Sequence, residues 1–283
     1  MIELMLAMTL WGTLGAFVLW AGLSAMEIAF YRCLFGAIPM GLWMLYRKET
    51  FSLDRPTRTV SLAALFLVLN WAFLFKSFQV SSITIGNMSY YLQPIMLIIM
   101  GIFLYQEKVS LSRWGLILMA LAGVLLTIDI HQLTSPHIAL GVLFALLAAF
   151  LYSLFTLLMK PVQMDFFKVI FIQLAIGGGI LLPFVTFHPL STTAWACLVM
   201  MGGVHTLLAY FLYYRALQKT TFTQIAIFSY LDPIIAIGSD VLFFHRHLDS
   251  YQMGGIGLTF VALYLLVMAS RQQAVPKTLA MAE

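Results

Sequence analysis

Residues 90–105 read YYLQPIMLIIMGIFLY, and residues 229–244 read SYLDPIIAIGSDVLFF. Each stretch is almost wholly apolar around one proline, and apolar neighbours extend each to the roughly 20 residues that a helix needs to cross a bilayer. The chain of 283 residues shares this character, with 62% hydrophobic residues, 9% charged residues and a mean hydropathy of +0.98. Because a soluble domain is roughly a quarter charged, the composition predicts an integral membrane protein.

Long apolar runs between charged or turn-forming breaks predict ten transmembrane helices. The runs lack the alternation of barrel strands, so the expected fold class is all-α. The first run follows a start without a basic segment, and we therefore expect it to be retained and not cleaved as a signal peptide. The predicted spans are residues 3–21, 26–46, 59–78, 83–105, 112–129, 137–159, 168–187, 193–214, 223–244 and 251–269.

The loops carry most of the positive charge. If the N-terminus is cytoplasmic, all Lys and Arg except Arg32, Lys76 and Arg246 fall on the cytoplasmic side. The positive-inside rule then predicts a multi-pass protein of the cell inner membrane with both termini in the cytoplasm. This distribution also explains the pI near 9.1 without nucleic acid as a partner.

The two quoted stretches are related by a shift of 139 residues. Tyr91 corresponds to Tyr230 and Pro94 to Pro233, and the match continues without a gap from residues 70–115 to residues 209–254. A gapless series of this length indicates a duplication.

Near the start of each half the shift is 141 residues, which pairs Trp11 with Tyr152 and Arg32 with Gln173. The sequence therefore predicts one repeat over residues 1–130, a second over 137–270, and a cytoplasmic tail over 271–283. Because five helices are an odd number, the second repeat should be inverted in the membrane. Inverted repeats of this kind place a solute site at their interface near the midplane.

Several motifs together resemble the EamA-type ten-helix members of the drug/metabolite transporter superfamily. They are Leu10-Trp11-Gly12-Thr13, Arg32, Tyr91-Leu92-Gln93-Pro94, Gln106-Glu107, Leu231-Asp232-Pro233 and Gly254. The resemblance covers residues 1–270 and implies a solute carrier in which helices one to four and six to nine surround a cavity, with helices five and ten at the periphery. One position departs from the pattern, because the acidic residue before the last helix of each repeat is Glu107 in the first half but Arg246 in the second.

Asp232 lies about nine residues, roughly 14 Å, from the inner end of its predicted helix, close to the bilayer centre. An ionisable group there costs several kcal/mol and is a candidate functional residue. Pro233 and its counterpart Pro94 each free a backbone carbonyl and kink the helix, so we expect both to act as hinges beside a polar seam. Asp232 would bind a cationic group or exchange a proton; the alternative is an Asp neutralised by a neighbour that stabilises the bundle.

Arg32 lies about 9 Å below the outer end of its predicted helix. Its guanidinium could extend to the lipid headgroups, grip a carboxylate or phosphate, or pair with Asp232 or Asp240. The vertical separation of Arg32 and Asp232 is only about 7 Å. This pair favours a zwitterionic or cationic solute such as an amino acid.

Aromatic and amide side chains near the predicted midplane complete the candidate site, because aromatic faces bind cations and aromatic groups alike. His205 is a second candidate for proton coupling, with a hydrogen bond between helices as the alternative. The predicted substrate-binding residues are Trp11, Arg32, Asn70, Trp71, Tyr90, Tyr91, Gln93, Tyr152, Gln173, His205, Tyr210, Tyr214, Tyr230 and Asp232.

Other classes of protein are less well supported by the sequence. An intramembrane transferase should show a nucleophile or acidic motif, and a channel should repeat one filter-like ring. We find no nucleotide-binding or metal-ligand motif, so we expect no cofactor. A monomer in the lipid bilayer suffices for transport; a carrier of anionic or nucleotide-like metabolites remains an alternative.

Overall fold

The computed structural model describes residues 1–49, 54–81, 83–126, 138–245 and 250–273. These residues form helices and no strand, which confirms the all-α prediction for them. Within the described residues, every predicted apolar span overlaps one helix or consecutive helices. Arg246 and residues 274–283 lie outside the described residues, as does the side chain of Asp240.

The first half of the chain forms a sequence of helices that run back and forth between two faces. We call the face where α1 begins the N-terminal face, and the face where α1 ends and α2 begins the far face. The helices are α1 (Ile2–Ala21), α2 (Ala25–Tyr46), α3 (Arg55–Val80), α4 (Ile83–Tyr90), α5 (Gln93–Tyr105) and α6 (Leu111–Leu126).

The second half begins at the far face. Its helices are α7 (Ile138–Met159), α8 (Phe166–Leu181) with the short 3-10 turn η2 (Leu182–Phe184), α9 (Thr192–Met200), the π-helix η3 (Met201–Leu208), α10 (Ala209–Leu217), α11 (Phe222–Ser229), α12 (Leu231–Phe244) and α13 (Ser250–Gln273).

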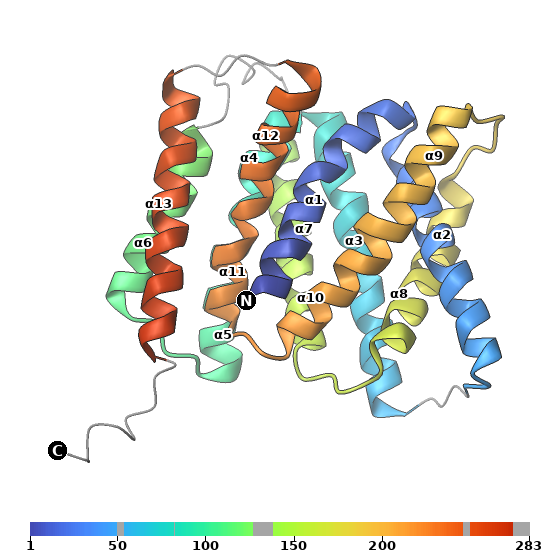
Figure 1. Ribbon diagram of the computed structural model, residues 1–283, viewed down its shortest axis with the longest axis horizontal. Helices are drawn as coiled ribbons and strands as arrows, with labels where there is room; N and C mark the ends of the chain where they lie inside the picture. The colour runs from blue at the N-terminus through green and yellow to red at the C-terminus, as the bar shows by residue number, and fades with distance from the viewer. Residues whose placement is uncertain (50–53, 82, 127–137, 246–249, 274–283) are drawn as a thin grey trace.

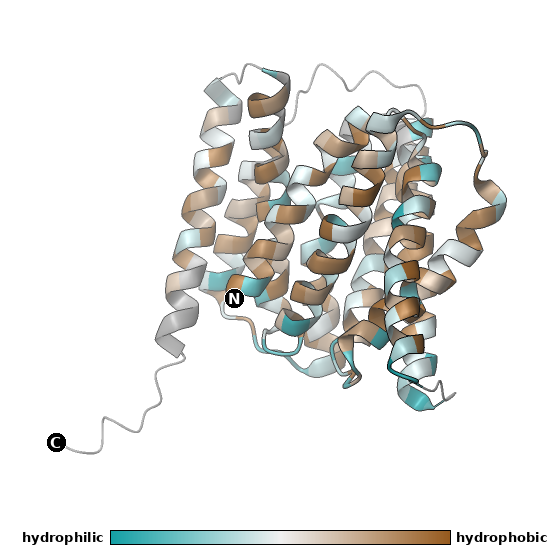
Figure 2. Cartoon of the chain, turned by 45° about the vertical axis from the view of Figure 1, so that its right-hand side comes forward, coloured by the Kyte–Doolittle hydropathy of each residue, from teal (hydrophilic) through white to brown (hydrophobic). Residues whose placement is uncertain are grey.

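Within the described residues, seven helical segments are long and apolar enough to cross a membrane, and three shorter apolar helices accompany them. The shorter ones are Gln93–Tyr105, Leu111–Gly123 and Met253–Leu265. Hydrophobic colouring prevails along the helices in Figure 2. This distribution is typical of helices whose outer surface contacts lipid.

Two of the predicted spans are interrupted next to a proline. The chain leaves the helical path between α4 and α5 just before Pro94, and between α11 and α12 just before Pro233. Proline removes a backbone donor and its ring clashes with the preceding turn, which explains the break. The π-helix interrupts the segment α9–α10 without a proline.

The helices pack in pairs that relate the two halves. In Figure 1, α6 and α13 lie side by side at one edge, and these two helices contact each other. Further contacts join α2 to α8, α3 to α7, α1 to α12, and α5 to α11. The peripheral position expected of residues 112–129 and 251–269 agrees with the place of α6 and α13.

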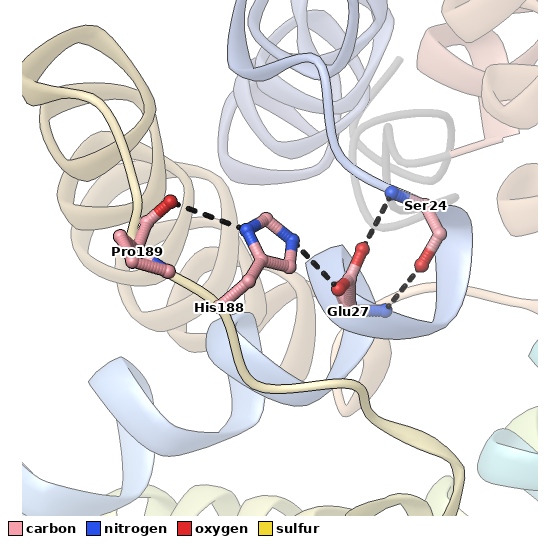
Figure 3. Close-up of polar contacts among 4 residues, drawn as sticks. All are labelled: Ser24, Glu27, His188 and Pro189. Atoms are coloured by element: carbon pink, nitrogen blue, oxygen red, sulfur yellow. Dashed lines mark hydrogen bonds and ion pairs between the residues drawn. The ribbon is translucent and has the colours of Figure 1, made fainter.

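A contact between a glutamate and a basic or imidazole side chain joins the α2 region to the α8 region at each face. At the N-terminal face, Lys168 lies 3.7 Å from the carboxylate of Glu49. At the far face, Figure 3 shows the ring of His188 between the carbonyl oxygen of Pro189 and the carboxylate of Glu27, with Nε2 3.1 Å from Oε1. Glu27 also accepts a hydrogen bond from the backbone of Ser24, so the same carboxylate caps α2 and holds the α8–α9 connection.

Candidate functional site

A cavity of about 350 Å³ lies between the middle of the bundle and the far face. The two proline-linked breaks and the far-face portions of α1, α2 and α3 form its wall. The lining residues are Met8, Trp11, Leu14, Val18, Ala25, Ile28, Ala29, Arg32, Asn70, Trp71, Leu74, Phe75, Asn87, Tyr90, Tyr91, Gln93, Pro94, Tyr152, Tyr210, Ser229, Tyr230, Asp232, Pro233 and Ala236.

Asp232 supplies a carboxylate to this wall from the first turn of α12. None of the described residues donates a hydrogen bond to its side chain or forms an ion pair with it. Removing a carboxylate from bulk water without a partner costs free energy. The cavity therefore contains an acceptor that a bound cation or proton would satisfy.

The counterpart of Asp232 in the first half has a partner. Gln93 donates a hydrogen bond of 3.4 Å to the hydroxyl of Ser153, and that hydroxyl is 3.3 Å from the Gln93 carbonyl oxygen. The residue that corresponds to Ser153 by the shift of 141 is Gly12, where an added Cβ would lie 2.7 Å from the carbonyl oxygen of Asp232. Gly12 brings α1 and α12 into close approach but offers no side chain to the Asp232 carboxylate.

Arg32 supplies a guanidinium from α2. Its side chain is only 8% exposed, so it does not extend to lipid headgroups. The Nε–H donates to the hydroxyl of Thr206 at 3.1 Å, and the guanidinium carbon lies 5.5 Å from the ring centre of Trp71. Among the described residues, neither of its terminal nitrogens has a hydrogen-bond partner, and Arg32 has no ion pair with Asp232.

Aromatic rings surround the two charged groups. Trp11 packs edge-on against Tyr210 with ring centres 5.2 Å apart, and Tyr90 and Tyr152 lie 6.5 Å apart. Asn70 orients the Tyr90 hydroxyl through a hydrogen bond of 3.1 Å. Faces of this kind favour cations and planar groups.

Two of the predicted site residues lie below the cavity, toward the N-terminal face. The hydroxyl of Tyr214 donates to the side-chain oxygen of Gln173, and the Gln173 amide contacts the sulfur of Met159 at 3.1 Å. Neither Gln173 nor Tyr214 lines the cavity. Both are buried and belong to the packed layer that closes it.

His205 also lies outside the cavity wall. Its Nε2 is 3.1 Å from the hydroxyl of Thr13, its ring packs on Phe17, and its backbone carbonyl accepts a hydrogen bond from Trp11. These contacts join α1 to η3 and agree with the alternative given above, in which His205 forms a hydrogen bond between helices.

Polar contacts join the helix ends and connecting turns at the N-terminal face. The ammonium of Lys160 donates to the carbonyl oxygens of Leu217, at 2.9 Å, and of Thr220. Burial lowers the pKa of this ammonium, and the carboxylate of Glu107 acts in the opposite direction. Glu107 in turn accepts a hydrogen bond of 3.3 Å from the backbone of Thr223.

A second ion-pair group lies at the same face. Glu3 at the start of α1 lies 2.9 Å from Arg215 and 3.7 Å from Lys219. It links the first helix to the end of α10 and to the turn that follows, so the N-terminal face is closed across both halves.

Sequence reasoning missed two kinds of residue. Asn87 lines the cavity; its spacing of three, four and seven residues from Tyr90, Tyr91 and Pro94 is a helical-face signal that could have found it. Thr206 holds Arg32 from inside a π-helix, and no feature of the sequence indicates that local geometry. Among the described residues, no group of three His, Cys, Asp or Glu side chains could hold a metal ion.

Comparisons with known proteins agree with this architecture. A model of the EamA-like transporter family matches residues 1–129 and again residues 139–268. "Uncharacterized transporter YxxF" of Bacillus subtilis (strain 168) is 32% identical to this chain, over 96% of it and 91% of the relative. The "S-adenosylmethionine uptake transporter" of Rickettsia conorii (strain ATCC VR-613 / Malish 7) is 22% identical, over 89% of this chain and 85% of that protein.

A solved crystal structure shares the fold with a TM-score of 0.81, covering 95% of this chain and 98% of that chain at 16% identity. The apolar helices and the family match together make this a multi-pass membrane protein of the transporter class. The family that the motifs resemble is confirmed: the chain belongs to the EamA-like transporter family.

Proposed function

We propose that the protein is a secondary transporter that moves a small zwitterionic or cationic organic solute across the cell inner membrane by alternating access. The observation that carries this proposal is the presence of Arg32 and Asp232, opposite charges without an ion-pair partner among the described residues, in one aromatic-lined cavity. Its volume of about 350 Å³ suits a small metabolite, since ligand pockets span roughly 300–1,000 Å³.

The chemistry of the wall favours a solute with a positive group and a carboxylate. The positive group would meet Asp232 and aromatic faces, and the carboxylate would meet the free nitrogens of Arg32. A purely anionic or nucleotide-like solute would leave Asp232 uncompensated. S-adenosylmethionine, named for the Rickettsia relative, carries a sulfonium, an amine and a carboxylate, and free amino acids carry the last two.

Two inverted repeats of five membrane helices are part of the proposal. Two family matches in tandem support the duplication. The packing pairs support a two-fold relation, because α2 contacts α8 and α6 contacts α13, and each of these helices meets its own counterpart. The ten spans would be the seven long segments together with the three shorter helices.

Alternating access is supported by a second, collapsed cavity. Its volume is about 10 Å³, and it lies toward the N-terminal face. Its lining includes the counterparts of large-cavity residues: Met159 for Val18, Phe166 for Ala25, Val169 for Ile28, and Tyr214 for Phe75. Rocking one repeat against the other would enlarge this cavity and close the first.

The positive charge of the loops indicates how the protein is oriented in the membrane. The Lys and Arg residues of the described loops gather at the N-terminal face, which we therefore place in the cytoplasm with both termini. The large cavity then opens outward, and the contacts of Lys160 and Glu3 form the closed cytoplasmic side.

A ligand screen tests the proposal. Purified protein is heated in detergent with S-adenosylmethionine, the twenty standard amino acids, and anionic controls such as succinate and AMP; a ligand that binds only the folded form raises the melting temperature. We expect a zwitterionic or cationic compound to stabilise the protein and to be taken up by proteoliposomes. Stabilisation and uptake of the anionic compounds alone would overturn the proposal.

A further inference from the structure

We infer that Thr206 is a positioning residue that sets Arg32 to receive a planar carboxylate end-on, through its two terminal nitrogens. The inference rests on the proposed function and adds to it a specificity-determining residue outside the cavity wall. Thr206 is fully buried and does not line the cavity. It acts through Arg32.

The hydroxyl of Thr206 donates one hydrogen bond and accepts another. The Thr206 hydroxyl donates to the carbonyl oxygen of Met201, five residues earlier, at 2.8 Å. With its single proton engaged there, the oxygen accepts the Nε–H of Arg32 at 3.1 Å. A threonine in a regular α-helix bonds a carbonyl three or four residues back, so the π-helix determines which carbonyl fixes this hydroxyl.

Close packing makes the contact possible. An added Cβ at Gly202 would lie 2.4 Å from Cβ of Phe35, so α2 and η3 approach as closely as a glycine allows. This approach brings the Thr206 hydroxyl, on the second repeat, within reach of Arg32 on the first.

The hydrogen bond between Arg32 and Thr206 excludes one of the two ways in which the Arg32 guanidinium can bind a carboxylate. A guanidinium grips a carboxylate either side-on, through Nε and one terminal nitrogen, or end-on, through both terminal nitrogens. Thr206 occupies Nε, and the face of Trp71 confines the guanidinium plane. Only the end-on fork remains for a solute, and it is the part of Arg32 without a partner among the described residues.

The test compares S-adenosylmethionine with its decarboxylated analogue, which lacks only the carboxylate. Binding of both to purified protein is measured for the wild type, Thr206→Val, Thr206→Ser, Arg32→Gln and the double variant Thr206→Val/Arg32→Gln. Valine keeps the shape of the side chain but lacks the hydroxyl oxygen that accepts from Arg32, whereas serine retains that oxygen. We expect Thr206→Val to weaken S-adenosylmethionine binding about tenfold, to change binding of the analogue less than twofold, and to have no further effect in the Arg32→Gln background; Thr206→Ser should bind as the wild type does.

Equal weakening of both probes by Thr206→Val, or failure of Thr206→Ser to restore binding, would assign Thr206 a structural role only and overturn the inference while the proposed function stands. An Arg32→Gln variant that keeps the preference for the carboxylate would also overturn the inference, because another group would then bind the carboxylate. Absence of S-adenosylmethionine binding by the wild type would overturn this inference, while stabilisation by an amino acid in the ligand screen would still support the proposed function.

Discussion

The hydroxyl of Tyr230 donates a hydrogen bond of 3.4 Å to the carbonyl oxygen of Tyr91, the residue 139 positions earlier and its own counterpart in the first half. The same relation recurs between Thr259 and the carbonyl oxygen of Ala120, also 139 positions apart and also 3.4 Å. Residues on a two-fold axis meet their own counterparts, whereas residues related by translation do not. Both contacts therefore support a two-fold relation between the two halves, as the proposed inverted repeats require.

Inverted repeats predict that counterparts lie on opposite sides of the membrane. Glu49 lies at the N-terminal face and His188, 139 positions later, lies at the far face, and each side chain is 45% exposed. We expect His188→Cys to react with a membrane-impermeant maleimide in intact cells, and Glu49→Cys to react only after permeabilisation. The native Cys33 and Cys197 are buried and should give little background. Equal labelling of both positions in intact cells would contradict the inverted arrangement.

Close packing at Gly12 predicts a large effect from one methyl group. An added Cβ would lie 2.6 Å from Cβ of Ile235 and 2.7 Å from the carbonyl oxygen of Asp232, so Gly12→Ala should cost about 1–3 kcal/mol and lower the melting temperature by several degrees. Gly15 on the same helix has no atom within 4 Å of such a Cβ, and Gly15→Ala should leave the melting temperature unchanged or raise it. Equal effects of the two variants would refute the close approach of α1 and α12.

The hydrogen bonds of Lys160 predict that its loss loosens the N-terminal face. Lys160→Met removes the donor to Leu217 and Thr220, and bonds from a charged group contribute about 1.5–3 kcal/mol each. Hydrogen–deuterium exchange of the backbone over residues 214–223 should become faster. Lys108 is exposed at the same face, and Lys108→Met serves as the control that leaves the exchange unchanged. Unaltered exchange in Lys160→Met would exclude Lys160 from the closure.

Much of the cavity wall could be predicted from the repeat, because near the midplane a residue and its counterpart in the other half can both line the cavity. Trp11 and its counterpart Tyr152 both line the cavity, and so do Tyr91 and Tyr230. Their role in binding stays a prediction. The helix positions could also be predicted, because a membrane-spanning helix needs only a long apolar run between charged or turn-forming residues.

Gln173 and Tyr214, two of the predicted site residues that do not line the cavity, share one physical reason. Gln173 corresponds to Arg32, and Tyr214 corresponds to Phe75, which lines the cavity. In the proposed inverted arrangement, counterparts far from the midplane face opposite sides of the membrane, so a cavity open on one side receives only one member of each pair. Sequence symmetry carries no information on which side is open.

The proposed transport depends on the carboxylate of Asp232, and a transport assay on a charge-removing variant tests this role. Asp232→Asn keeps the shape of the side chain and removes its charge, while Asp165→Asn, at the exposed cap of α8, serves as the matched control because Asn is as good a helix cap as Asp. Proteoliposomes with each variant take up the compound that most stabilises the wild type, at several pH values. We expect the initial uptake by Asp232→Asn to fall at least about tenfold, as the loss of a charge-assisted hydrogen bond requires, and to lose its dependence on pH. Uptake and pH dependence equal to those of the wild type would exclude the Asp232 carboxylate from the transport mechanism.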